Sequence, residues 1–553
     1  MKFYKSITVF LVALLLSGNL NAQTGRAARY QPGDWVNYAN FHFITSFEEG
    51  RDYVYIGTTH GVLRFNQLSN QWDIPYTLSN GLYNDYVLNM VWVNENRELW
   101  VITRGGIDII YGGTDRWRHI SQTNTYFQQF SQSIQVGQSS EFVFVNTGSR
   151  VLAINKFSNS IEQPSRAQVD QIRWKDLRFN ANDLPLYSLQ NPEWFINRAG
   201  GSLEDQDYRQ FPFTVSFKDS RNSEYLGTWG AGFIKADATT LIGQVHRFGP
   251  VSTPVGAVYQ DADNIWFGSA SDRYQGPTEI LGFPGISKWN FRTNDWYHIT
   301  PQEETRIQNA TIYTIQSDGS GGWLGTNRGL LHYNQQKNRW NSINDRQLGV
   351  VQINDMVVDD STLWTATRTG VYEIANPAGN VRKKLSLLDK EIFAVYDLTK
   401  LGEHLYMATD YGLARYNTST AEIEYYNEQG TTVSADEFDF VRVFLLTSSG
   451  DKLYYTTNYG MYELQPETGQ MEQIPNIGLN ATSQIRVLKG EPERVWVGFD
   501  DGAGELFTDR YEWEFYTTED GLAANTVYDI FVDDEFVWFA TRAGVTRFRK
   551  PQY

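Results

Sequence analysis

Polar and aromatic residues recur just before a glycine throughout the chain, as in LWTATRTGVYEI at 363–374. Each time, an apolar segment ends in Thr-x-x-Gly and a second apolar segment follows. Arginine at such a corner can bind carboxylate or phosphate through two parallel hydrogen bonds, and Tyr or Trp can stack on a sugar or an aromatic side chain. The candidate ligand-binding residues are His60, Arg104, Trp229, Arg273, Tyr274, Arg328, Arg368, Tyr411, Tyr459 and Arg542.

Four of the five candidate arginines, Arg104, Arg328, Arg368 and Arg542, are expected at the same corner position in four units. Arg273 and Tyr274 belong to the longest corner, SASDRYQGPTEILGFPG at 269–285, and Asp500 stands at another corner. Long loops in compact repeats are often functional. A solvated turn without a ligand is the alternative for every corner residue.

The corners are positioned by a repeating unit of four predicted strands. An alternating apolar strand ends in an acidic turn, as in NTVYDIFVDDE at 525–535, and a Trp/Tyr-rich strand, the corner and a third strand follow. A polar turn then leads to an amphipathic fourth strand such as EWEFYT at 512–517. Period-two alternation between Gly, Asn and Asp turns is typical of hairpins. We expect the second-strand tryptophans to be buried; they are Trp100, Trp266, Trp323, Trp364, Trp496 and Trp538.

The unit recurs about every 42 residues, the length of a four-stranded propeller blade. Eleven second strands are predicted, starting at Tyr53, Leu99, Phe142, Tyr225, Ile265, Trp323, Leu363, Leu405, Leu453, Val495 and Val537. The gap between the third and fourth predicts a degenerate twelfth blade in residues 166–213. The fold class is therefore all-β, a β-propeller of about 11–12 four-stranded blades arranged as two propellers side by side, because single rings usually hold four to eight.

The two ends of the chain predict how a ring closes. The last unit stops after its third strand, VTRFRK, and GDWVNYA at 33–39 resembles a fourth strand without a blade. Pairing the two would leave no long unpaired edge; an open solenoid capped by this segment is the alternative. The expected domains are a signal peptide at 1–22, a short segment at 23–32, a first propeller at 33–300 and a second at 301–550.

Composition excludes several classes of protein. Residues 1–22 combine Lys2 and Lys5 with a short apolar run, which predicts export to the periplasm or outer surface of a Gram-negative bacterium. No later segment is long and apolar enough to span a bilayer. The chain has no cysteine and a net charge of −17, about −19 once the two signal lysines are removed. Nucleic acid is an unlikely partner of so acidic a chain, since phosphate contacts require clustered Lys and Arg.

Catalytic and metal motifs are not found. The seven histidines show no HxH or HExxH spacing, and the acidic turns DADN at 261–264 and VDDE at 532–535 lack an EF-hand's alternating ligands. They are predicted to close hairpins. No nucleophile elbow is present. We therefore expect no enzyme, no metal and no cofactor, although a propeller hydrolase with carboxylates in its funnel remains an alternative.

The repeats resemble those of the two-component regulator propeller family, in which GL-x-x-Y, W-x-x-Y and DGL-x-x-x-x-V-x-x-I-x-x-D segments recur. TTEDGLAANTVYDIFVDDE at 517–535 and TLSNGLYNDYVLNMVWVNE at 77–95 carry the likeness, which covers nearly all of 33–550. The segment GDWVNYANFHFITSFEEGRDYVYIGTTHGVLRFN is similar to the start of the PorZ-type propellers of the Bacteroidetes type IX secretion system. No sandwich domain, membrane helix or kinase follows Lys550, so cargo sorting and signalling are not implied.

These resemblances imply a binding or scaffold protein of the cell envelope whose partner is a glycan, a lipopolysaccharide or an envelope protein. Two alternatives stay open. One is the ligand-sensing propeller of a carbohydrate-responsive two-component system without its own kinase, and the other is a glycan-active propeller enzyme.

Overall fold

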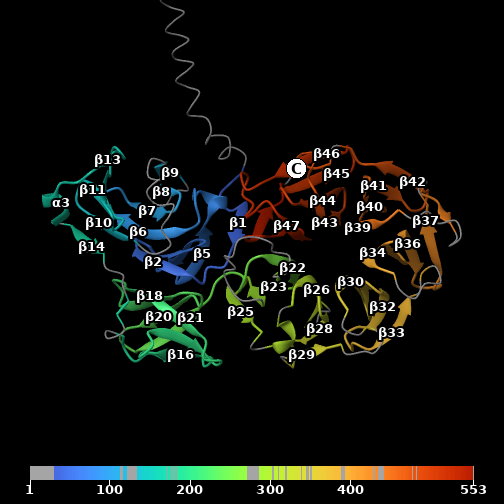
Figure 1. The fold of residues 1–553 in the computed structure, drawn as a ribbon, viewed down its shortest axis with the longest axis horizontal. Helices are drawn as coiled ribbons and strands as arrows, with labels where there is room; N and C mark the ends of the chain where they lie inside the picture. Colours follow the sequence, from blue (N-terminus) through green and yellow to red (C-terminus); the bar gives the residue numbers. More distant parts are fainter. Residues whose placement is uncertain are drawn as a thin grey trace, which may run out of the picture.

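The computed structural model describes residues 30–551 with several internal gaps. The gaps are 112–115, 121–133, 171, 176–178, 181–183, 271–284, 302–303, 309, 318–320, 338, 344–347, 349–350, 386, 388–392, 428–429, 434–440, 476 and 481. The predicted signal peptide and the corner residues Arg273 and Tyr274 lie outside the described residues. The described strands form eleven sheets, arranged as two groups side by side (Figure 1).

The first group contains four sheets. The first sheet has β2 (Ile44–Glu49), β3 (Tyr53–Thr58), β4 (Gly61–Asn66) and β5 (Gln71–Tyr76). The second has β6 (Val87–Val93), β7 (Glu98–Thr103), β8 (Gly106–Tyr111) and β9 (Trp117–Ile120). The third has β10 (Gln135–Gln138), β11 (Phe142–Asn146), β12 (Val151–Asn155), β13 (Ile161–Glu162) and β14 (Arg173–Lys175). The fourth has β15 (Ser188–Leu189), β16 (Trp194–Asn197), β17 (Ser202–Asp205), β18 (Gln210–Lys218), β19 (Ser223–Thr228), β20 (Phe233–Asp237) and β21 (Ile242–His246). A short helix, α3 (Arg166–Asp170), precedes β14, and a 3-10 turn, η1 (Leu78–Asn80), follows β5.

The second group contains seven sheets. The first four are β22 (Val255–Asp261), β23 (Asn264–Ser269), β24 (Ile286–Asn290) and β25 (Asp295–Ile299); β26 (Ile312–Ser317), β27 (Gly321–Thr326), β28 (Gly329–Asn334) and β29 (Arg339–Ser342), after the 3-10 turn η4 (Thr305–Ile307); β30 (Ile353–Asp359), β31 (Thr362–Thr367), β32 (Gly370–Ala375) and β33 (Val381–Leu385); and β34 (Val395–Leu401), β35 (His404–Thr409), β36 (Gly412–Asn417), β37 (Ile423–Tyr426) and β38 (Thr432–Val433). The fifth has β39 (Val443–Ser449), β40 (Lys452–Thr457), β41 (Gly460–Gln465) and β42 (Gln470–Gln473). The sixth has β43 (Ile485–Glu491), β44 (Arg494–Phe499), β45 (Ala503–Phe507) and β46 (Glu512–Tyr516). The seventh has β47 (Val527–Val532), β48 (Phe536–Thr541), β49 (Gly544–Arg549) and β1 (Trp35–Tyr38).

The second group is a closed ring. Its innermost strands β22, β26, β30, β34, β39, β43 and β47 each pack against the next, and β47 packs against β22. Side chains on these strands accept backbone N–H groups of the neighbouring sheet. Asp397 Oδ2 accepts from Leu446 N at 2.8 Å, and Asp529 Oδ2 accepts from Val258 N at 2.9 Å, which joins the last sheet to the first. The propeller fold and the eleven second strands expected from the sequence are confirmed.

The N-terminal strand closes the ring, as the sequence predicts. Strand β1 pairs antiparallel with β49, with Trp35 opposite Phe548 and Tyr38 opposite Val545. In Figure 1 this blue strand lies beside red β47, at the boundary between the two groups. The last sheet of the ring therefore consists of residues from both ends of the described chain, and the open solenoid is excluded for this ring.

The first group is built differently, and the expected twelfth blade is wrong. The described strands of residues 166–213 add to neighbouring sheets instead, because β14 joins β10 while β16 and β17 extend the sheet of β18. Strand β14 brings Lys175 to the inner strands of the neighbouring sheets. Its Nζ donates to Phe47 O, Glu48 Oε2 and Met90 O, and lies 5.8 Å from the ring centre of Phe217 on β18. One ammonium thus links three of the four sheets.

Two segments cross between the groups and run beside each other. Phe41 N donates to Phe248 O at 3.3 Å and Asn40 Nδ2 to Val251 O at 3.1 Å. The approach is close enough to require Gly249, whose φ is +80° and whose added Cβ would lie 1.7 Å from Ala39 O. After the crossing, β22 packs against β26 and β47. The expected boundary at 300/301 therefore falls inside a set of sheets that pack on one another, because residues 255–299 pack with the later sheets.

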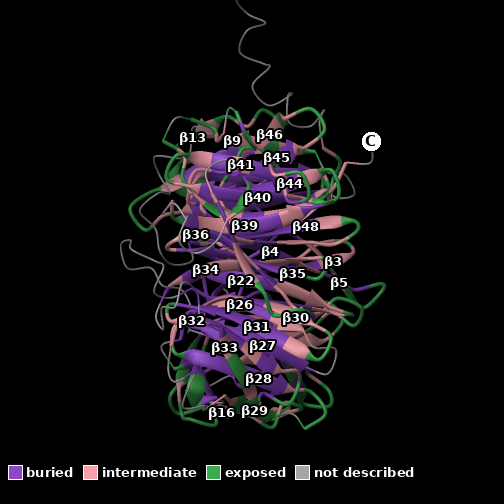
Figure 2. Ribbon diagram, turned by 90° about the vertical axis from the view of Figure 1, so that its right-hand side faces the viewer, coloured by how far each residue is buried: buried purple, intermediate pink, exposed green. Residues whose placement is uncertain are grey.

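The acidic turns and the second-strand tryptophans stabilise each other. Indole Nε1 atoms donate to turn carboxylates five residues earlier: Trp266 to Asp261 at 2.8 Å and Trp496 to Glu491 at 2.7 Å. A buried indole N–H is more stable with such an acceptor, which explains why the turns before these two strands carry a carboxylate. All six predicted tryptophans are buried, and Figure 2 shows buried strand residues inside and exposed turns at the margins.

Candidate functional site

Each Thr-x-x-Gly corner is held by its threonine. Thr367 Oγ1 donates to Gly370 O at 2.7 Å and accepts from Thr369 N at 3.0 Å, and Thr326 makes the same two bonds. The glycine takes a positive φ, +133° at Gly544, where an added Cβ would lie 2.4 Å from Tyr38 O on the adjacent strand. Threonine and glycine therefore fix the backbone, and the two residues between them are free to vary.

The structure separates the corner candidates into two sets. His60, Arg104 and Trp229 belong to the first group of sheets, and Arg328, Arg368, Tyr411, Tyr459 and Arg542 to the second ring. Within a blade the corner lies at the same end as the start of the innermost strand. Arg542 N, for example, donates to Thr526 O at 3.2 Å, just before β47. The second set consequently shares one end of one ring.

One expectation about the corner arginines is wrong. Arg104, Arg368 and Arg542 directly follow the corner threonine, but Arg328 stands one residue later, next to Gly329. Its side chain turns back, and Nη1 donates to Gln308 O at 2.8 Å. The four arginines are therefore not equivalent, although Arg328, Arg368 and Arg542 are all exposed.

The corner residues of the first group are engaged by the protein. The guanidinium of Arg104 lies 3.5 Å from the ring centre of Tyr86, and Trp229 packs edge-on against Phe43 at 5.2 Å. His60 Nδ1 lies 2.9 Å from Thr59 Oγ1, and burial lowers the pKa of His60 to about 4. The imidazole is accordingly neutral near pH 7.

A feature that sequence reasoning missed lies beside the second set of corners. The innermost strand of every sheet in the second ring has an irregular register one residue after its start. The residues left out of the pairing are Gly256, Tyr313, Asn354, Tyr396, Phe444, Arg486 and Tyr528. Bulges re-aim side chains. In the second ring this residue directly follows the first Val or Ile of the strand, which is the sequence signal. Where the first group has the same irregularity, the residue left out is Thr45, Leu88 or Thr214.

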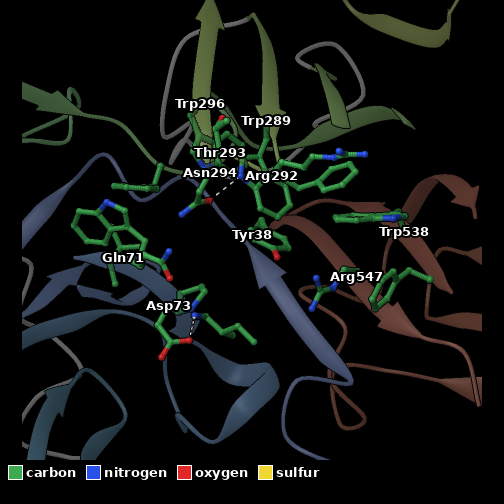
Figure 3. Close-up of a pocket in the computed structure, with 18 of the residues that line it drawn as sticks. Tyr38, Gln71, Asp73, Trp289, Arg292, Thr293, Asn294, Trp296, Trp538 and Arg547 are labelled. Carbon is green, nitrogen blue, oxygen red and sulfur yellow. Dashed lines mark hydrogen bonds between the residues drawn. The ribbon is translucent and has the colours of Figure 1, made fainter. Parts of the chain in front are cut away.

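A cavity with a volume of about 740 Å³ lies between the two groups. Three segments form its walls (Figure 3): β5 and its turn, β24 and β25, and the last sheet with β1. Nine aromatic side chains line it, namely Tyr38, Phe41, Trp72, Phe248, Trp289, Phe291, Trp296, Phe536 and Trp538. Trp72 and Trp296 are only half-buried, so part of each indole stays accessible.

Polar groups converge on the same cavity. The guanidinium of Arg547 lies 4.4 Å from the ring centre of Phe536, and its Nε is buried without a partner among the described residues. Asp73 accepts from Tyr53 Oη at 2.9 Å and Asn294 from Trp289 Nε1 at 2.9 Å. Figure 3 shows Gln71 and Asp73 across the cavity from Trp289 and Trp296. Largely apolar walls with a few placed polar groups are typical of a ligand site.

One residue of the cavity wall, Tyr38, has a shifted pKa. Burial raises the pKa of the Tyr38 phenol, and the charge of Arg547 opposes that rise. No local sequence pattern indicates this site, because residues from 38 to 547 meet there only once the ring is closed.

A histidine that lies outside the cavity is paired with a carboxylate. His119 has only 9 % of its side chain exposed and pairs with Asp108, Nδ1 to Oδ1 at 2.7 Å. Among the described residues no group of three or more His, Cys, Asp or Glu is arranged to hold a metal. In the same part of the chain no helix is long and apolar enough to cross a membrane.

Comparison with known proteins gives a likeness of fold. No family model matches the chain, and no curated protein matches it. Among solved structures, PorZ, described as an essential bacterial surface component of the type-IX secretion system of Porphyromonas gingivalis, aligns with a TM-score of 0.56 at 11 % identity, over 94 % of this chain and 87 % of its own. The chain therefore has a PorZ-like fold. The extracellular domain of a putative hybrid two-component system, BT3049 of B. thetaiotaomicron, aligns with a TM-score of 0.42 at 14 % identity, over 94 % and 77 %.

Proposed function

We propose that the chain is an exported binding protein of the bacterial cell envelope and that the cavity between its two groups of sheets takes a glycan. The PorZ-like fold supports an envelope role, since PorZ is described as a bacterial surface component. The alternatives for the partner are a lipopolysaccharide and an envelope protein.

The observation that carries this proposal is the pairing of accessible indoles with polar groups around one cavity. Trp72 and Trp296 offer apolar faces on which a sugar ring can stack. Gln71, Asn294 and Arg547 supply hydrogen-bond donors for sugar hydroxyls, and the Arg547 Nε needs an acceptor. A glycan offers both a ring face that can stack on the indoles and hydroxyl groups that can accept from these donors.

We propose binding rather than catalysis at this cavity. Three of the four carboxylates that line it have partners in the protein. Asp73 accepts from Tyr53 and Ile74 N, and Asp533 accepts from Phe536 N and Trp538 Nε1. Glu535 pairs with Arg549 at 3.4 Å. A carboxylate held in this way stabilises its turn and has few acceptor positions left for acid–base work.

A glycan and lipopolysaccharide panel tests the proposal on the purified mature chain, with intrinsic tryptophan fluorescence as a second readout. Arg547→Gln and Gln71→Ala should each weaken the bound glycan by about tenfold, the effect of losing a charged or well-placed hydrogen bond. Arg510→Gln, an exposed arginine paired with Glu512, is the matched control. Unchanged affinity in Arg547→Gln at an unchanged melting temperature would contradict the site, and a panel without any bound glycan would contradict the ligand class.

A further inference from the structure

The corner end of the second ring is rich in arginine although the chain is acidic overall. Its corners and the starts of its innermost strands, where described, hold five arginines and three aspartates. The arginines are Arg328, Arg368, Arg442, Arg486 and Arg542. The same places in the first group, where described, hold Arg104, Arg150 and Asp85.

The three aspartates at this end are engaged by the protein. Asp410 pairs with Arg442 at 3.4 Å and accepts from Tyr396 Oη at 2.6 Å. Asp500 accepts from Gln484 N at 2.8 Å, and Asp501 accepts from Ser483 Oγ at 2.7 Å. By contrast, neither Arg368 nor Arg486 forms an ion pair within the described part of the chain. Of the three aspartates only Asp410 pairs with a cation there, so the five arginines exceed the three aspartates by two charges and the guanidinium groups of Arg368 and Arg486 stay available.

Aromatic residues lie among these arginines. Tyr396 and Phe444, bulged residues of adjacent sheets, have ring centres 5.9 Å apart, and the Arg442 guanidinium lies 6.0 and 5.9 Å from them. Further round the ring, Arg486 lies 5.8 Å from the ring centre of Tyr528. Tyr396 and Phe444 are half-buried, whereas Arg442 and Arg486 are exposed. Guanidinium groups thus stand beside partly accessible apolar rings.

We propose that this end of the second ring binds an acidic protein segment that carries bulky apolar side chains. Arginine forks match carboxylates in geometry and charge. The Phe444 ring has no polar atom, so beside the arginines it favours an apolar side chain over a sugar hydroxyl. The placement of the arginines also fits such a segment. Arg368, Arg442 and Arg486 come from three different sheets, and an extended peptide can reach several of them. This site is separate from the cavity between the groups and does not depend on a glycan there.

The test uses a fluorescein-labelled peptide that alternates Glu–Glu with Phe, and two matched peptides with Gln for Glu or Gly for Phe. Fluorescence anisotropy with the mature chain should show binding of the first peptide, weaker binding of both matched peptides, and loss of affinity as salt rises. Arg368→Gln, Arg442→Gln and Arg486→Gln should each weaken binding by up to about tenfold and additively, and Arg104→Gln, in the first group, should not.

Several results would overturn this inference. They are no binding of the Glu–Phe peptide at low salt, equal binding of the Gln peptide, or unchanged affinity in the triple arginine variant at an unchanged melting temperature. If an acidic oligosaccharide binds the same arginines more tightly than the peptide, the partner of this site is a glycan and not a protein. Arg547→Gln separates this site from the cavity, because it should leave peptide binding unchanged whether or not the cavity binds a glycan.

Discussion

Trp35 and Phe548 stack with ring centres 4.1 Å apart and an interplanar angle of 22°, although they stand near opposite ends of the described chain. Both are buried, and Trp35 also lies 5.5 Å from Tyr516 in the preceding sheet. Folding of the second ring is therefore tied to an N-terminal segment that precedes the whole first group. The first group is in effect an insertion between the outermost strand of a blade and the rest of its ring.

Removing this contact should destabilise the second ring. Trp35→Ala leaves a cavity against Phe548 and Tyr516 and should lower the free energy of unfolding by about 3–5 kcal/mol. Deletion of residues 24–40 should cost at least as much, because it also exposes the edge of β49. Thermal and urea unfolding measure both effects. Leu68→Ala, which truncates an exposed side chain in the turn after β4, serves as the control, and an unchanged melting temperature after the deletion would refute the closure.

Two tryptophans at equivalent places should respond differently to the same substitution. Trp496 donates to Glu491 at 2.7 Å, whereas the Trp364 Nε1 is buried with no partner among the described residues. Trp496→Phe should therefore be more destabilising than Trp364→Phe by about 1–3 kcal/mol, because it removes the donor to Glu491 Oε1 and leaves that carboxylate with Lys550 alone in the described part of the chain. Trp364→Ala should cost about 3–5 kcal/mol as a large-to-small change. Equal stabilities of the two Phe variants in urea would show that the indole hydrogen bond contributes little.

The repeat made most of the fold predictable. Alternating strands, acidic turns and Thr-x-x-Gly corners are local features, so the starts of the second strands and the pairing of β1 with β49 followed from the sequence. The division between the groups did not, because a strand-to-strand link that crosses between rings has the same local pattern as one within a ring. Lys175 was also unpredictable, since its partners Phe47, Glu48 and Met90 belong to other sheets.

The candidate sites were less predictable than the fold for a related reason. Corner residues are visible in the repeat, but their partners are not. Nothing local distinguishes Arg104, which stacks on Tyr86, from Arg368, which has no ion pair among the described residues. The cavity that Arg547 lines required ring closure before its walls could meet. Whether any corner residue binds a ligand stays a prediction.

Asp397 should make the second ring less stable as pH rises. Burial raises its pKa well above the usual value, and the neighbouring carboxylate of Asp355 raises it further. The folded chain therefore holds a proton that the unfolded chain has lost above about pH 4, so stability falls between that pH and the raised pKa. Asp397→Asn keeps an acceptor for Leu446 N and removes the titration. Relative to the parent it should gain up to about 1.4 kcal/mol per pH unit across this window, in urea unfolding.

The matched control for Asp397→Asn is Asp509→Asn, which removes an exposed acid of the turn after β45. Its unfolding free energy should follow that of the parent chain at every pH. If Asp397→Asn does the same, the proton between Asp355 and Asp397 has no influence on stability.

Two buried histidines at the crossing between the groups should have the opposite pH dependence. The rings of His42 and His298 lie 5.0 Å apart. Burial lowers the pKa of His42 well below 6.5, with further lowering by Arg247, His298 and His60; burial and Arg247 do the same for His298. Both are neutral in the folded chain, so their contribution is complete above pH 6.5 and is lost as pH falls below it, by about 1.4 kcal/mol per pH unit for each histidine.

The double variant His42→Gln, His298→Gln isolates this effect from the other titrating groups. Glutamine cannot be protonated, so the difference in unfolding free energy between parent and variant should shrink from pH 7 to pH 5 as the parent loses stability faster. His404→Gln, a half-buried histidine beside Asn417, should keep the slope of the parent. Because Phe41 and Asn40 bond the second crossing segment here, proteolysis at 247–254 should also rise with acid in the parent and not in the double variant. Parallel slopes for the parent and the double variant would mean that these imidazoles titrate alike in the folded and unfolded chains.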